Sequence, residues 1–179
     1  MEPKTSFKII TTKDELYQVI QHCRTTGYAS IDFETNAAPV ASDLFFPTIL
    51  GVSFQPGFSY IIPLAHFDSP FKNSWKSILG IFSRLVYSNP NIVKIAWNFS
   101  FEYKIFYKYG HIPRGYLFDG MLARYILDEV GPFGLKPNVA RYIPEWGGYE
   151  DNYEGSNKDW AEKPLEGLSK YCGLDCDNT

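Results

Sequence analysis

The chain has 179 residues, of which 45% are hydrophobic and 17% aromatic, and its formal net charge at pH 7 is −3. A chain of this length and composition can bury a complete core, which favours one globular domain over a disordered chain or several domains. The small net charge excludes a generally basic coat for nucleic acid, so a polyanion would have to be bound locally or through metal ions.

Three cysteines, Cys23, Cys172 and Cys176, form an odd and sparse set, which fits a reducing compartment better than a disulfide framework. The opening residues lack the apolar core of a signal peptide. No later apolar run approaches the roughly 20 residues needed to cross a bilayer. We therefore expect a soluble, cytoplasmic protein that does not contact a membrane.

Extended and helical patterns alternate along the first half of the chain. The pattern predicts a short strand over residues 6–10, a helix over 11–27, a strand over 28–35, and a hairpin of strands over 48–55 and 59–67. In the helix, Leu16, Val19, Ile20 and Cys23 share one face, and Gly27 ends it. The three strands that follow the helix form a meander.

Helices dominate the second half. The pattern predicts a helix over residues 73–88, a buried strand over 91–97, a helix over 98–110 closed by Gly110, a short strand over 115–118, helices over 119–130 and 134–143, and a last helix from about Pro164. Residues 144–162 form the longest irregular stretch, and such stretches are often functional. A meander followed by alternating helices and strands predicts an α/β fold with a mixed sheet flanked by helices.

Two acids stand near the end of the strand over residues 28–35. Asp32 and Glu34 are two residues apart, so both side chains project from one face of the strand, and Phe33 points to the other. This strand should be central in the sheet, which places the two carboxylates at the edge of the main crevice. Two like charges side by side need a counter-charge. The alternative is a solvated strand end, because acid pairs at this spacing also arise by chance.

Two further pairs have helical spacing. Asn98 and Glu102 are four residues apart and are expected to share a helix face, although Glu102 alone would be interpreted as an exposed helix acid. Tyr171 and Asp175 have the same spacing on the last helix, so a phenol and a carboxylate can point at one place. The alternative for Asp175 is a surface acid near a buried tyrosine.

Cys172 and Cys176 are also one helical turn apart, which suggests zinc. However, His22, His66 and His111 lack the usual ligand spacing, so we interpret the histidines as packing residues and do not expect zinc. The sequence contains no P-loop and no dinucleotide-binding glycine pattern, so it gives no support to nucleotide-triphosphate hydrolysis or to a redox cofactor.

Three motifs occur in a fixed order: DxE at 32–34, NxxxE at 98–102 and YxxxD at 171–175. Together they resemble the three exonuclease motifs of the 3′-to-5′ proofreading domain of family A DNA polymerases. The framework segments ILGVSF, SYIIPLAH, KIAWNFSFEYKIF and LFDGMLARYIL are similar to those of bacterial and phage enzymes of the DNA polymerase I type. The resemblance therefore covers nearly the whole chain.

The resemblance implies a ribonuclease H-like fold of the DEDD superfamily, with a five-stranded mixed sheet and two divalent ions, Mg²⁺ or Mn²⁺. Carboxylates suit these ions, because hard cations prefer oxygen ligands. By the resemblance, Asp32 bridges both ions, Glu34 and Asp175 hold the ion that carries the nucleophile, and Glu102 supports the second ion through water. Tyr171 orients the attacking water by a hydrogen bond.

Other positions refine the resemblance. Position 170 is Lys and not the histidine of the other branch of the superfamily, which indicates the tyrosine branch. Glu102 stands where the better-known bacterial enzymes have Asp, which leaves a weakened or lost activity open. Asn98 and Phe101 match positions that contact the terminal nucleotide, although Phe101 could equally be core. Asp119 matches a framework position and is interpreted as a helix cap.

These features imply a metal-dependent 3′-to-5′ exonuclease that releases mononucleotides from single-stranded or frayed DNA ends. We expect residues 1–179 to be one monomeric exonuclease domain, excised within its last helix from a longer DNA polymerase of a bacterial or phage-infected cell. The polymerase domain of that chain would be its partner. Two alternatives stay open: an exoribonuclease of the ribonuclease D type, and a degenerate module that holds DNA without cutting it.

Overall fold

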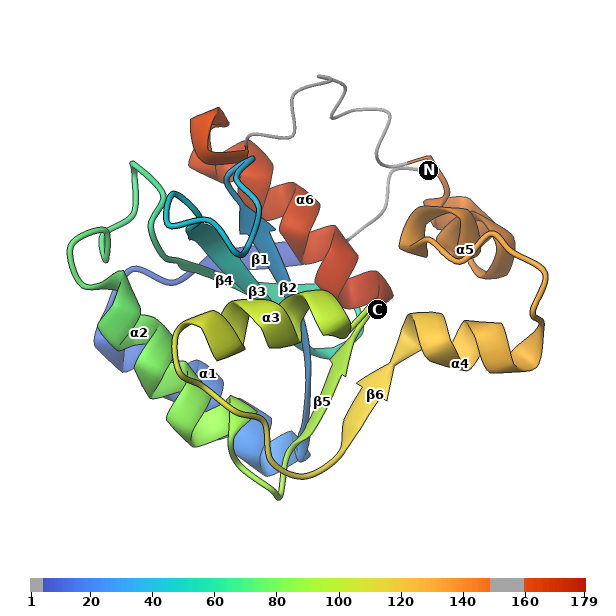
Figure 1. Ribbon diagram of the computed structural model, residues 1–179, viewed down its shortest axis with the longest axis horizontal. Helices are drawn as coiled ribbons and strands as arrows, with labels where there is room; N and C mark the ends of the chain where they lie inside the picture. Colours follow the sequence, from blue (N-terminus) through green and yellow to red (C-terminus); the bar gives the residue numbers. More distant parts are fainter. Residues whose placement is uncertain (1–4, 149–159) are drawn as a thin grey trace.

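The computed structural model describes residues 5–148 and 160–179 (Figure 1). Within them the chain forms a six-stranded sheet with the strand order β1-β4-β3-β2-β5-β6. The strands are β1 (Ser6–Ile9), β2 (Tyr28–Thr35), β3 (Pro47–Gln55), β4 (Phe58–Pro63), β5 (Val93–Ala96) and β6 (Leu117–Asp119). The helices are α1 (Lys13–Thr26), α2 (Trp75–Phe82), α3 (Ser100–Lys108), α4 (Gly120–Leu127), α5 (Leu135–Tyr142) and α6 (Leu165–Asn178).

The sheet is mixed, as the order of elements predicts. β3 pairs antiparallel with β2 and with β4, whereas β1–β4, β2–β5 and β5–β6 are parallel pairs. β2 lies in the interior of the sheet, which confirms its expected central place. The count of five strands that the resemblance implies is wrong. The short strand predicted over residues 115–118 is present as β6, and it adds an edge strand by pairing Phe118 with Ile95 of β5.

Short helical segments complete the chain. A π-helical turn, η1 (Ser83–Tyr87), continues α2, so the helix expected over residues 73–88 changes its hydrogen bonding midway. Part of the expected irregular stretch, residues 149–159, lies outside the described residues. Its described ends form the 3₁₀ turns η2 (Pro144–Trp146) and η4 (Trp160–Glu162). Among the described helices, none has the length and apolar character required to span a membrane.

The two faces of the sheet pack against different helices (Figure 1). Alternate residues of β2, namely Ala29, Ile31 and Phe33, join the large core cluster with residues of α1 and α2. On the opposite face, Ile49 of β3 and Ile61 of β4 pack against buried residues of α6. Strand alternation thus gives β2 one apolar face for the core and one face for α6.

Hydrogen bonds from the sheet fix α6 near its end. The Ser30 hydroxyl of β2 donates to the Cys176 carbonyl at 2.8 Å, and the Ser59 hydroxyl of β4 donates to the Gly173 carbonyl at 2.7 Å. The Asp177 carboxylate accepts the N–H of Gly57 at 2.8 Å, so it faces the β3–β4 turn. These contacts set which residues of α6 lie over β2.

Each histidine contacts an aromatic ring, but of the three only His66 is a buried packing residue as expected; His111 is half-buried and His22 is exposed on α1. The ring centroids are 5.5 Å apart for His22 and Phe54, 4.3 Å for His66 and Phe67, and 6.4 Å for His111 and Phe106. His66 is fully buried, accepts the Asp68 N–H at Nδ1, and places Nε2 2.8 Å from the Lys163 carbonyl oxygen. These contacts tie the segment after β4 to the start of α6.

The close approach of α6 to β3 gives a stability prediction. A Cβ atom on Gly51 would lie 2.5 Å from the Cys176 sulfur and 2.7 Å from the Cys172 sulfur. We expect Gly51→Ala to lower the free energy of unfolding by about 1 to 3 kcal/mol, as overpacking of a filled core does. Thermal denaturation measures the effect.

Gly167→Ala is the matched control on α6. Among the described residues, and apart from its chain neighbours and the backbone of the helix itself, no heavy atom lies within 4 Å of a Cβ placed there. Alanine should therefore raise stability by about 0.5 to 1 kcal/mol, because glycine is unfavourable inside a helix. A Gly51→Ala protein as stable as wild type would show that α6 does not pack as closely as described.

Candidate active site

Two carboxylates come from the end of β2. Asp32 and Glu34 point to the face of the sheet that α6 covers, while Phe33 is buried in the opposite core, 5.1 Å from the Phe106 ring in an edge-to-face contact. The pairing of β2 with β3 shifts register directly after Glu34. β2 therefore delivers its two acids just before its regular pairing ends.

α6 brings the third carboxylate. One carboxylate oxygen each of Asp32, Glu34 and Asp175 lie within 4.8 Å of one another. These three side chains, which we call the acid centre, join residues that are more than 140 positions apart in the sequence. The predicted convergence of the first and third motifs is therefore present in the structure.

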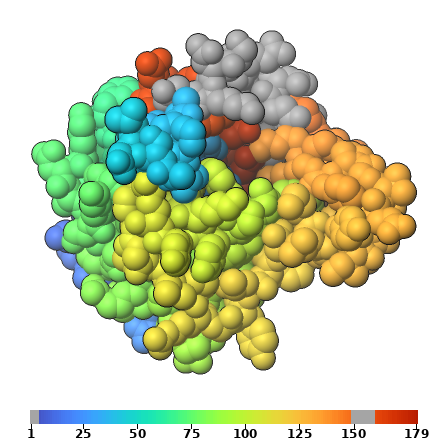
Figure 2. Space-filling view, viewed as in Figure 1, coloured from blue at the N-terminus to red at the C-terminus, as the bar shows by residue number. Residues whose placement is uncertain are grey.

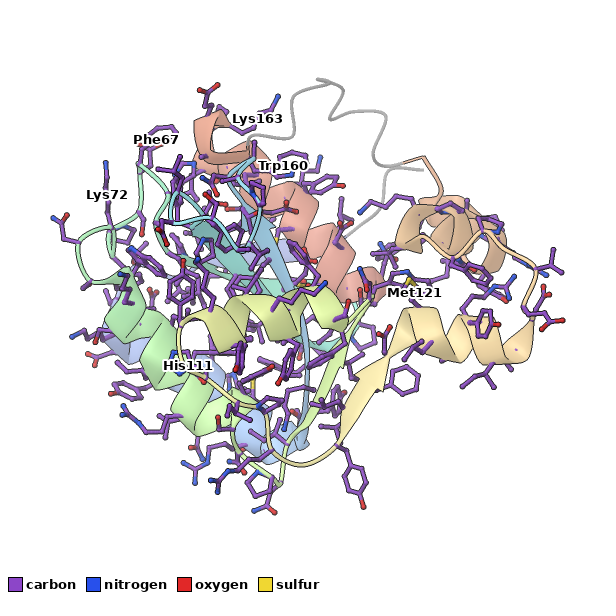
Figure 3. The ribbon with its side chains drawn as sticks, in the orientation of Figure 1. Phe67, Lys72, His111, Met121, Trp160 and Lys163 are labelled. Carbon is purple, nitrogen blue, oxygen red and sulfur yellow. The ribbon has the colours of Figure 1, made fainter. Side chains whose placement is uncertain are left out.

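Tyr171 lies one helical turn before Asp175 on α6, as its spacing predicts. Its ring stacks on Trp160 with the centroids 4.8 Å apart. Figure 3 shows Trp160 beside the first turns of α6. In Figure 2, the red surface of α6 is recessed between the cyan segment that follows β2 and the orange surface of α5. In this view α6 therefore lies below the surface between these two segments.

Glu102 of α3 interacts electrostatically with Asp32 and Glu34 but is not one of the three acids of the acid centre. It is only 1% exposed, so the interpretation as an exposed helix acid is wrong. Its Oε2 atom has no hydrogen-bond partner among the described residues. A buried carboxylate oxygen without a hydrogen-bond partner lowers the stability of the folded protein, and a bound cation or an ordered water would supply the missing interaction.

The expected helical relation between Asn98 and Glu102 is wrong. α3 begins at Ser100, and Asn98 precedes it with a φ of 63°, in the left-handed region that Asn tolerates better than most residues. The Asn98 side-chain oxygen accepts the Ser100 hydroxyl at 2.8 Å. Phe101 is half-buried and packs against the large core cluster.

Asp119 is a cap, as predicted. Its carboxylate accepts the backbone N–H groups of Met121 and Leu122 at the start of α4. It also accepts the N–H groups of Asn98 and Phe99 at 3.0 and 2.9 Å. Asp119 therefore joins the start of α4 to the segment that leads into α3.

The acids near the site raise the pKa of one another. Burial, followed by repulsion from Asp175, raises the pKa of Asp32 to about 7. Burial, followed by repulsion from Asp32, raises the pKa values of Glu34 and Glu102 well above their ordinary range. In each case the charged form is the disfavoured one, so added positive charge would stabilise it.

Lys136 of α5 supplies one positive charge. Its ammonium group forms an ion pair with Asp175 and lies 4.6 Å from the centroid of the Tyr171 ring. Burial alone would lower the pKa of Lys136, but Asp175 and Tyr171 outweigh it and raise that pKa. Sequence reasoning missed Lys136, because it lies 39 positions from Asp175 and belongs to none of the three motifs.

The donor set of the acid centre suits a hard divalent cation. Three carboxylates from two elements converge within 4.8 Å, and Lys136 contributes one positive charge through its ion pair with Asp175. Mg²⁺ and Mn²⁺ bind carboxylate oxygens at such centres. Asp32, Glu34 and Asp175 can therefore hold a metal ion, with Glu102 nearby.

Comparisons with known sequences agree with this geometry. A family model described as 3′-5′ exonuclease matches residues 7–179. DNA polymerase I of Borreliella burgdorferi is 31% identical over 176 residues, which are 97% of this chain and 18% of that protein. The chain thus spans about a fifth of the length of this relative.

Solved structures share the fold at low sequence identity. Escherichia coli RNase D matches with a TM-score of 0.72 at 19% identity, over 97% of this chain and 42% of that one. The catalytic core of RRP6 from Trypanosoma brucei has a TM-score of 0.72 at 16% identity, over 97% of this chain and 44% of that one. The fold is therefore ribonuclease H-like, and by the match of its sequence the chain belongs to the 3′-5′ exonuclease family, of the kind found in DNA polymerase I.

Proposed function

We propose that this domain hydrolyses DNA from its 3′ end with the help of two divalent metal ions, Mg²⁺ or Mn²⁺, and releases mononucleotides. The convergence of Asp32, Glu34 and Asp175 within 4.8 Å carries the proposal. Two divalent ions, when bound, supply the positive charge that activates water and stabilises the departing 3′ oxygen.

Each residue of the site would have a separate role in binding the metal ions or in orienting the attacking water. Asp32 interacts electrostatically with both Asp175 and Glu102, so we assign it as the ligand that two ions would share. Glu34 and Asp175 would hold the first ion. Glu102, with its unpartnered oxygen, would support the second through water. Tyr171, held between Trp160 and Lys136, would accept or donate a hydrogen bond that orients the attacking water.

Nucleotide contacts would come from the start of α3 and the segment that leads into it. Asn98 and Phe101 flank the turn that leads to Glu102, and the Phe101 N–H donates to the Asn98 carbonyl at 2.9 Å. Phe101 is half-buried and directly precedes Glu102 in the sequence, and an aromatic ring that stacks on the terminal base contributes about 1 to 3 kcal/mol per base. We therefore keep Asn98 and Phe101 as nucleotide-binding residues.

DNA is the preferred substrate because the 31% identical relative is a DNA polymerase I. An RNase D-like activity is the second candidate, since RNase D shares the fold with a TM-score of 0.72. The relative also favours a place within a longer chain that carries a polymerase domain, in a bacterial or phage-infected cytoplasm. In that setting the domain would act as a monomer on single-stranded or frayed ends, in proofreading.

The direct test compares labelled DNA and RNA oligonucleotides of one sequence in Mg²⁺, Mn²⁺ or EDTA. We expect mononucleotides from the DNA 3′ end in either metal and none in EDTA. Faster cleavage of RNA than of DNA would favour the RNase D-like activity. If neither substrate is cleaved, the proposal that the domain is an active nuclease is contradicted.

Asp32→Asn should lower the cleavage rate at least about a hundredfold, since even an outer-shell partner of a metal is worth about 10- to 100-fold. The fold should persist, because the change removes a charge that its neighbours repel. Asp14→Asn, the same change at an exposed position of α1, should leave the rate unaltered. Cleavage by Asp32→Asn at the wild-type rate would exclude the two-metal assignment.

Glu102 gives a graded test. Glu102→Asp should keep much of the activity, because a water molecule can fill the space left by one methylene. Glu102→Ala should lose far more, with partial recovery in Mn²⁺, whose coordination is less demanding than that of Mg²⁺. Glu166→Ala, an exposed acid on α6, is the control. Equal Mg²⁺-dependent rates for Glu102→Ala and wild type would remove Glu102 from the site.

The raised pKa values predict how stability depends on pH without metal. Between the unfolded pKa of an Asp, about 3.9, and the folded pKa of Asp32, about 7, the folded protein binds more protons than the unfolded chain. In EDTA, the melting temperature should therefore fall as pH rises through this window. Mg²⁺ should reduce the fall, and Asp32→Asn should make it shallower; a steeper fall in Asp32→Asn would contradict the assignment.

A further inference from the structure

Two cysteines of α6 meet a third metal-binding group that their sequence spacing does not reveal. Cys172 and Cys176 are one turn apart on the buried face of the helix, with exposures of 0% and 1%. In the sheet below, Asp32 of β2 pairs with Gly51 of β3. Because Gly51 has no side chain, the sulfur atoms of Cys172 and Cys176 can pack directly against the backbone of this strand pair.

One ligand atom each of Asp32, Cys172 and Cys176 lie within 4.8 Å of one another. The Cys172 sulfur is 3.6 Å from the Asp32 Oδ2 atom. A zinc ion lies about 2.3 Å from sulfur and about 2.0 to 2.2 Å from carboxylate oxygen, so two of its ligands are at most about 4.6 Å apart. The three atoms are therefore close to the spacing that one ion requires.

We propose that Cys172, Cys176 and Asp32 form a binding site for a thiophilic divalent cation, such as Zn²⁺ or Cd²⁺. Soft thiolate ligands select these ions over Mg²⁺ and Mn²⁺, which prefer oxygen. Two sulfurs and one carboxylate give three protein ligands and leave a fourth position for water, a common arrangement for zinc. On binding, both thiols release their protons to solvent.

This site shares Asp32 with the acid centre. Of its three ligands, Asp32 is the one that is partly exposed, so the cation enters from the side of the acid centre. A thiophilic ion that draws Asp32 toward the sulfurs removes the ligand that both catalytic ions would share. Binding therefore inhibits the nuclease, and this inhibition, but not the binding itself, rests on the proposed function.

The binding test uses Cd²⁺ alone with the thiols kept reduced by a phosphine. Coordinated thiolates give an ultraviolet charge-transfer band, which does not depend on activity. We expect the band in wild type and in Cys23→Ala, whose cysteine lies buried on α1 in the other core cluster. Cys172→Ala and Cys176→Ala should each bind at least about tenfold more weakly, the lower end of what disturbing a metal centre costs.

Excess Mg²⁺ should weaken Cd²⁺ binding to wild type, because the two ions compete for Asp32. Serine variants, which keep more of the side-chain volume, replace the alanine variants if thermal denaturation shows that these do not fold. No band in wild type, or an equal band in Cys172→Ala and wild type, overturns the proposal and leaves the sulfurs as packing groups.

The activity test measures cleavage in Mg²⁺ with increasing Cd²⁺, relative to the cadmium-free rate of each variant. Wild type and Cys23→Ala should be inhibited, and the double variant Cys172→Ala/Cys176→Ala should need at least about tenfold more Cd²⁺. Equal inhibition of the double variant would place the inhibitory ion at the carboxylates and overturn the inhibition. A wild type that binds Cd²⁺ but never cleaves DNA would contradict the proposed function and leave the cation site intact.

Discussion

The site depends on the burial of several carboxylates that repel one another. Asp32, Glu34 and Asp175 converge within 4.8 Å, and burial together with repulsion raises the pKa of Asp32 to about 7. The surrounding fold has to hold them together against that repulsion, and it does so from both sides. β2 is clamped between two strands of the sheet, and α6 is bonded to the sheet through side-chain hydroxyls.

The contrast between Asp119 and Glu102 shows what distinguishes a structural acid from an available one. Both lie near the start of α3. The Asp119 carboxylate accepts four backbone N–H groups, so its charge is already satisfied by fixed dipoles. Glu102 is more deeply buried and retains an oxygen without a partner among the described residues. The supply of local donors, rather than closeness to the site, decides which acid can serve a cation.

The spacing of residues in the sequence predicted correctly those features that depend on the geometry of a single strand or helix. The alternation of β2 placed Asp32 and Glu34 on one face, and Gly27 ends α1 as predicted. Asn98 failed, because assuming a regular helix ignored the left-handed residue before α3. Lys136 and the proximity of Asp32 to the α6 cysteines could not be foreseen, since both depend on how helices pack on the sheet and no periodicity encodes that packing. The sequence pattern did predict β6, as a short strand over residues 115–118; the count of five strands came from the family resemblance.

The hydroxyl contacts to the Gly173 and Cys176 carbonyls have a mechanical consequence. A helix held only by apolar side chains can slide or turn against its support, and known conformational switches move an element by a whole helical turn of about 5.4 Å. The Ser30 and Ser59 hydroxyls recognise particular carbonyls, so such a movement would break both bonds at once. The two hydrogen bonds therefore fix the position of α6 along its own axis. Because a misplacement of about 1 Å can cost about a hundredfold in rate, the axial position of this helix is itself a determinant of catalysis.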